Sequence, residues 1–230
     1  MPAQLAALRK LIEHRFPDAV PLTQRVARPV ATGIAALDRI LPGGGLPRGK
    51  LTTWAPHGAG AMALLRGACH AVRASGERAA WIHGAGTVGP FWDDGALLIQ
   101  PKGRMEALVS AEVVLRSGGF ALVVLTGVDP EGTETVRLTR AVREGGGAFV
   151  ALTANAALAM LRLTSRILPH RYRWRRGPFD EPALPEAVAI DVQARALGWN
   201  ARTTVTLPIA SHDVRLSLDP ELVDRRGCPR

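Results

Sequence analysis

The sequence predicts an α/β fold in which helices cover both faces of a mainly parallel, twisted sheet. Strand-like apolar runs alternate with helical patterns of about ten or more residues between residues 51 and 152. The runs at residues 120–125 and 148–152 are continuously apolar, as in central strands that are buried on both faces. Beyond residue 165, consecutive strands separated by turns replace this alternation, which predicts an antiparallel C-terminal extension of the same sheet.

The spacing of apolar residues places the individual elements. Strands are expected at residues 51–54, 79–82, 96–99, 120–125 and 148–152, then at 167–175, 187–194, 203–207 and 214–218. Helices are expected at residues 61–74, 104–116 and 133–144, and the last of them ends at a run of three glycines, a stop signal. The first of these helices places the following residues on one face: Ala61, Leu65, Ala68, Cys69 and Val72.

Both ends of the chain are expected to lie outside this core. Residues 1–31 are interpreted as an N-terminal helix at 3–14 and a proline-containing linker, residues 32–218 as the core domain, and residues 219–230 as a basic tail. The N-terminal helix is amphipathic, and its apolar stripe consists of Leu5, Leu8, Leu11 and Ile12.

Composition limits the class of protein. A hydrophobic content of 47% and a charged content of 21% indicate a globular chain and exclude a mostly disordered one. No apolar run reaches the roughly 18 residues of a membrane span, and the start of the chain lacks a secretion signal. Cys69 and Cys228 do not suggest a disulfide framework, so we expect a cytoplasmic protein.

The net charge of +9 comes almost wholly from arginine, because the 29 basic residues include only three lysines. Arginine pairs with phosphate or carboxylate through a planar fork, so this balance suggests a polyanion or an acidic protein as partner. A compositional bias of the genome explains the total charge equally well, and both interpretations stay open.

The most informative stretch runs from Thr32-Gly33 through Leu37-Asp38 to Gly43-Gly44-Gly45-Leu46-Pro47-Arg48-Gly49, directly ahead of the first core strand. It resembles the RecA/RadA family, in which such a stretch leads into a strand and a phosphate-binding loop. The resemblance covers residues 30–153 and implies a RecA-like core.

The residues that handle ATP in that family are replaced here. The fingerprint G-x-x-x-x-G-K-[ST] falls on Ala55 to Met62, where Gly60 matches, Ala61 replaces the lysine and Met62 replaces the magnesium-binding hydroxyl residue. Thr126 takes the place of the metal-linked aspartate, and Ala85 lies where the family carries its water-activating glutamate. Because phosphoryl transfer depends on positioned charge, we expect no ATPase activity, no catalytic residue, no cofactor and no metal.

Three further residues could bear on a ligand. His57 in the loop and Arg66 in the following helix could approach a phosphate, although we favour a loop residue and a solvated cation. His83 follows a strand at the carboxyl edge of the sheet, where ligands of open α/β folds bind, but a polar loop residue is the favoured interpretation.

A cluster of arginines is the second candidate site. Residues 162–176 contain six arginines and no acid: Arg162, Arg166, Arg171, Arg173, Arg175 and Arg176. Alternation over residues 171–175 places arginines on one strand face and Tyr172 and Trp174 on a core face. This face suits nucleic acid or an acidic partner, and an ordinary solvated strand face is equally compatible.

A RecA-like core without nucleotide chemistry, an N-terminal amphipathic helix and an arginine-rich C-terminal half resemble the ImuA family of mutasome accessory proteins. The resemblance implies a nucleoid-associated role in the SOS response and error-prone translesion synthesis, with RecA and an ImuB-like, Y-family-polymerase-like subunit as partners. It makes residues 3–12 a partner-binding candidate, although packing on the chain's own domain is as compatible. The alternative is a recombinase paralogue that binds single-stranded DNA electrostatically, although the connections after residues 126 and 153 are short for DNA-binding loops of the RecA type.

Overall fold

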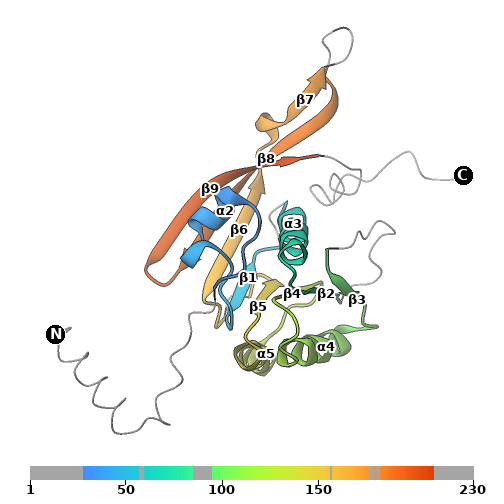
Figure 1. Ribbon diagram of the computed structural model, residues 1–230, viewed down its shortest axis with the longest axis vertical. Helices are drawn as coiled ribbons and strands as arrows, with labels where there is room; N and C mark the ends of the chain where they lie inside the picture. Colours follow the sequence, from blue (N-terminus) through green and yellow to red (C-terminus); the bar gives the residue numbers. More distant parts are fainter. Residues whose placement is uncertain are drawn as a thin grey trace, which may run out of the picture.

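The computed structural model describes residues 28–56, 60–84, 95–155, 157–176, 179 and 182–209. The predicted helix at residues 3–14, the predicted strand at 214–218 and the tail at 219–230 lie outside these residues. The described strands form one mixed sheet in the order β3-β2-β4-β5-β1-β6-β8-β7, with β9 paired to β8 (Figure 1). The predicted architecture, a mainly parallel sheet with an antiparallel C-terminal extension, is confirmed.

Parallel strands build the first half of the sheet. They are β1 (Leu51–Trp54), β2 (Ala79–His83), β3 (Leu97–Ile99), β4 (Leu122–Thr126) and β5 (Ala148–Leu152). β4 pairs with both β2 and β5, and its five residues are all buried, as the continuous apolar run predicts. β1 lies between β5 and β6, so the loop that follows it opens at the middle of the sheet.

Helices cover the two faces of the sheet unequally (Figure 1). α4 (Arg104–Arg116) and α5 (Gly132–Gly145) pack on the second hydrophobic cluster, whose strand residues come from β1, β2, β4 and β5. α3 (Ala61–Ala74) packs on the opposite face over a larger cluster that also includes residues of β6, β8 and β9. The residues predicted to share one face of α3 are all buried, as expected.

Hydrogen bonds fix the conformation of residues 30–46, which belong to the stretch that resembles the RecA/RadA family. The backbone N–H and the hydroxyl of Thr32 both donate to the Asp38 carboxylate at 2.8 Å, which fixes the start of α2 (Ala35–Ile40). Val30 and Leu46 exchange two backbone hydrogen bonds of 2.8 Å, and the short 3-10 turn Pro42–Gly44 lies between them. A Cβ at Gly45 would lie 2.5 Å from the Val30 oxygen, so this close approach requires glycine. These residues of the glycine-rich stretch therefore stabilise the fold.

The C-terminal half differs from the prediction in one strand. The expected strand at residues 167–175 is wrong: β6 (Leu161–Ile167) precedes a 3-10 turn at Pro169–Arg171, and β7 (Arg173–Arg176) follows it. Pro169 has no N–H to donate to a ladder, so the chain turns there. β6 is parallel to β1, and the antiparallel pairing begins on its other side with β8 (Pro182–Ala196).

β8 is long enough to pair with three other strands. It pairs with β6 and β7 in succession, and with β9 (Trp199–Pro208) on its other edge. The β7–β8 ribbon extends away from the rest of the molecule in Figure 1. None of the helices in the described part of the chain has the length and apolar character needed to cross a membrane.

Candidate functional site

The candidate nucleotide site lies at the carboxyl edge of the parallel strands, between β1 and α3. β1 ends at Trp54, and α3 begins at Ala61 directly after Gly60. A loop in this position would point backbone N–H groups and the positive end of the helix dipole at a phosphate. Residues 57–59, including His57, lie outside the described residues, so the site is built from the residues on either side of them.

Gly60 marks the point where the loop enters the helix. Its φ of +94° is in the left-handed region, and a Cβ there would lie 2.6 Å from Cδ1 of Ile190 on β8. The matching glycine of the fingerprint is therefore required by both backbone conformation and space. The fully buried Ile190 side chain also places a branched apolar group against the N-terminus of α3.

The two residues after Gly60 carry no phosphate-binding group. Ala61 is buried, and Met62 is half-buried and packs against the hydrophobic cluster beneath α3. A lysine at the first position would reach the β- and γ-phosphates, and a hydroxyl at the second would hold magnesium. The start of α3 thus packs into the core with apolar side chains where a nucleotide site needs charge.

Thr126 ends β4 beside the site and is fully engaged with its neighbours. Its hydroxyl accepts a hydrogen bond from the indole nitrogen of Trp81 at 3.2 Å and lies 2.8 Å from Nδ1 of His83. Thr126 is buried, and Trp81 is completely inaccessible to solvent. This hydroxyl satisfies a buried indole N–H, and unlike a carboxylate it carries no negative charge.

A second buried tryptophan, Trp54, lies at the end of β1. The indole nitrogen of Trp54 donates to the hydroxyl of Ser165 on β6 at 3.1 Å, and its backbone oxygen accepts from the N–H of Thr153 at 3.0 Å. Sequence reasoning missed this arrangement, although a tryptophan within each of two strands was its signal. Two large indoles, each with a satisfied donor, therefore lie in the hydrophobic cluster under α3.

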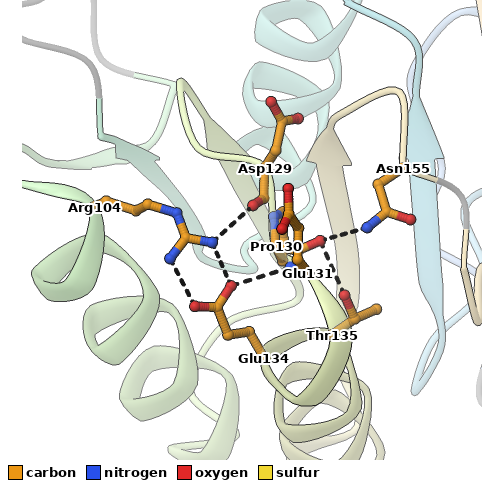
Figure 2. A network of polar contacts seen from close by, with 7 residues as sticks. All are labelled: Arg104, Asp129, Pro130, Glu131, Glu134, Thr135 and Asn155. Carbon is orange, nitrogen blue, oxygen red and sulfur yellow. Dashed lines mark hydrogen bonds and ion pairs between the residues drawn. The ribbon is translucent and has the colours of Figure 1, made fainter.

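The connections after β4 and β5 are fastened to each other, as Figure 2 shows. The side-chain amide of Asn155 donates to the Pro130 oxygen at 2.8 Å, and the hydroxyl of Thr135 donates to the same oxygen at 3.0 Å. Arg104 on α4 forms two bonds to the Glu134 carboxylate and one to the Asp129 oxygen. The network joins α4, α5 and both connections into one unit.

Other chemistry is limited within the described residues. They contain no group of histidine, cysteine and acidic side chains that could hold a metal ion. Burial raises the pKa of the Cys69 thiol to about 12, so this thiol stays protonated and is a poor nucleophile at neutral pH. Ala85, at the position of the family's glutamate, lies outside the described residues.

The arginine cluster does not form a single face. Arg162 and Arg166 lie on the exposed face of β6, Arg171 lies in the 3-10 turn, and the other three lie on β7. Glu186 forms ion pairs with both Arg173 and Arg175, at 3.7 and 3.3 Å, as expected for two arginines on one side of a strand.

The aromatic core face predicted opposite these arginines is wrong. Trp174 is 45% exposed, and all four residues of β7 are exposed. The reason is that β7 belongs to the projecting ribbon, where no helix of the described chain covers it, and that its pairing with β8 shifts register after Arg173. Only Tyr172, before the strand, packs against the core, and its ring lies 5.9 Å from that of Trp174.

Comparison with known proteins finds similarity to RecA proteins. No family model matches the sequence. The protein RecA of Salinispora tropica is 31% identical over 151 residues, which are 61% of this chain and 42% of that protein. RecA of Listeria monocytogenes is 31% identical over 149 residues, which are 60% of this chain and 41% of that protein. The chain thus spans less than half the length of these curated relatives, and the similarity, with the mixed sheet, supports a RecA-like core.

The first prediction concerns the hydroxyl of Thr126. Thr126→Val removes the acceptor of a fully buried indole N–H, which costs roughly 1–3 kcal/mol of unfolding free energy. In a Trp81→Phe background the same substitution should cost at least about 1 kcal/mol less, because no N–H is left unsatisfied. Urea unfolding of the four proteins measures this difference. Equal losses of unfolding free energy in the two backgrounds would show that the Thr126 hydroxyl does not stabilise the fold by accepting a hydrogen bond from the Trp81 indole.

The second prediction concerns acid stability. The hydrogen bonds from the Arg104 side chain, and then that from the Glu131 backbone, hold the pKa of Glu134 below its ordinary value. A carboxyl with a lowered folded-state pKa stabilises the fold above the unfolded pKa and loses this contribution as pH falls through the folded value. Glu134→Gln should therefore destabilise the protein at neutral pH and progressively less below about pH 4.

Urea unfolding of wild type and variant between neutral and acid pH checks this expectation. Arg104→Gln, which removes the main cause of the shift, should show the same convergence with the wild type in acid. A gap in unfolding free energy that stays constant down to about pH 2 would contradict it.

Proposed function

We propose that this chain is a non-catalytic, RecA-like accessory protein of ImuA type. It acts in damage-induced, error-prone translesion synthesis by binding RecA and a Y-family-polymerase-like subunit in the nucleoid. The observation that carries the proposal is Thr126, whose neutral hydroxyl is engaged with Trp81 and His83 at the position of a metal-linked carboxylate. Ala61 and Met62 add to it, because both are apolar at the start of α3. A RecA-like scaffold without nucleotide chemistry acts through its surfaces.

A surface suited to a protein partner supports this proposal. α4 is apolar on two sides: Ala107, Leu108 and Leu115 face the core, while other apolar residues face outward. Met105, Val109 and Val113 lie four residues apart on the outward side and are 62%, 50% and 62% exposed. An exposed apolar stripe of this kind marks a site for protein contact.

Ion pairs border this stripe. Glu112 accepts bonds from Arg116 and Arg137, and Arg116 also pairs with Glu144 on α5 at 3.2 Å. The positive and negative charges of these ion pairs compensate each other, so the apolar stripe is bordered by polar side chains without an excess of either charge. This is the usual plan of a protein interface.

The capture of purified RecA tests the proposal. The tagged full chain should retain RecA and the polymerase-like subunit on a resin without added ATP. Val109→Asp should weaken retention of at least one of them by at least about tenfold, because a charge at the centre of an apolar contact is desolvated without a partner.

Val136→Asp on α5 is the matched control, because this valine is also about half exposed, at 54%, and lies on a neighbouring helix. It should leave retention unchanged. Failure of the wild-type chain to retain either protein, with or without DNA, would refute the proposed role. Equal effects of the two aspartate variants would refute the assignment of the α4 surface.

A further inference from the structure

A groove lies where the antiparallel extension meets the parallel strands. The start of β6, the β8–β9 turn, the end of β1 and the connection after β5 line it, and its volume is about 590 Å³. Pockets of roughly 300–1,000 Å³ are typical of sites that bind ligands. The residues that line the groove include Met160, Arg162, Arg195 and Leu197.

Two guanidinium groups stand side by side in this groove. Arg162 on β6 and Arg195 on β8 are directly opposite each other in the antiparallel register, and both are exposed. Like charges directly opposite each other destabilise a sheet. Among the described residues, those that line the groove include no aspartate or glutamate. The charge of the groove therefore favours an anionic ligand.

Apolar side chains flank the two arginines. Met160 is 44% exposed, and Leu197 in the β8–β9 turn is completely exposed. Leu158, two residues before Met160, is 58% exposed and has a φ of +61°, a conformation that side chains other than glycine rarely adopt. The groove thus offers aliphatic contact next to cationic contact.

The sheet face that adjoins the groove extends the positive charge. Arg166 on β6 and Arg202 on β9 lie on the same exposed side as Arg162 and Arg195. Among the residues of β6, β8 and β9 that the structure describes, Asp191 is the acid on this side, and its carboxylate is held by Arg202 at 2.6 Å. Cations on this side therefore outnumber acids, which would steer an acidic segment towards the groove.

We infer that this groove binds a short acidic peptide segment with interspersed apolar residues, supplied by a protein partner. The inference rests on the proposed function, because it names the chemistry of one partner contact. Carboxylates would pair with Arg162 and Arg195, while an apolar side chain would pack against Met160 and Leu197. A nucleic-acid strand is the weaker fit, because such strands bind on aromatic stacking platforms and none of the described residues that line the groove is aromatic.

Fluorescence anisotropy tests the inference with the full chain and a labelled peptide of alternating aspartate and leucine. The peptide should bind, and a peptide with asparagine for aspartate or serine for leucine should bind at least about tenfold more weakly. An oligothymidylate of similar length is the competitor. If it binds more tightly than the peptide and displaces it, the groove takes nucleic acid and the inference is overturned.

Variants locate the binding. Arg162→Ala/Arg195→Ala should weaken peptide binding by at least about tenfold, and Leu197→Ser should weaken it severalfold. The matched control is Arg140→Ala/Arg143→Ala, which removes two exposed arginines from α5 and should leave binding unchanged. Leu197→Ser changes only a fully exposed side chain, so it keeps the test valid if the double arginine variant unfolds. Equal binding by all variants would overturn the inference.

One more outcome would overturn it. Residues 216–224 of this chain also combine leucines with Asp219, Glu221 and Asp224. If the peptide binds only after residues 210–230 are removed, the chain's own segment and not a partner fills the groove. The α4 variant Val109→Asp should leave peptide binding intact. A chain that captures RecA but does not bind the peptide therefore refutes this inference and leaves the proposed function standing.

Discussion

The hydrogen bond from the Trp81 indole to the Thr126 hydroxyl fixes the carboxyl ends of β2 and β4 against each other. Trp81 is completely buried, so its N–H requires an acceptor, and a short neutral side chain at the end of β4 supplies it. The same hydroxyl contacts His83, which ends β2. At the carboxyl edge of the sheet, Thr126 thus forms structural contacts between two neighbouring strands.

The two hydrophobic clusters explain where contact surfaces remain. The cluster under α3 continues from the parallel strands into β6, β8 and β9, whereas the strand residues of the cluster under α4 and α5 come only from the parallel strands. One face of the extension is therefore left to polar side chains and arginines. The second exposed feature, the stripe on α4, arises because that helix is apolar on more than the side that it buries. The extent of each helical layer therefore determines where these two surfaces are exposed.

Sequence patterns predicted the parallel half of the fold closely but placed one strand of the C-terminal half wrongly. α3 and α4 lie where their periodicity placed them, because their buried residues recur at helical spacing. The strand expected at residues 167–175 was wrong because it ran across Pro169, which has no N–H for a ladder and begins the 3-10 turn between β6 and β7. Trp174 faces solvent for a related reason: alternation assigns a side chain to one side of a strand but does not tell which side is covered. The residue types at positions 61, 62 and 126 are readable from the sequence, whereas the indole contacts of Trp54 and Trp81 were not predicted, since they join strands distant in the chain.

Titration calorimetry of the full chain with ATP and magnesium tests whether the carboxyl edge of the sheet binds nucleotide. We predict no heat of binding with micromolar affinity, because Ala61, Met62 and Thr126 supply neither a cation nor a carboxylate there. The same absence is expected with ADP. Saturable micromolar binding that requires magnesium would contradict it, since such binding needs a charged site that the apolar start of α3 and the engaged hydroxyl of Thr126 do not provide.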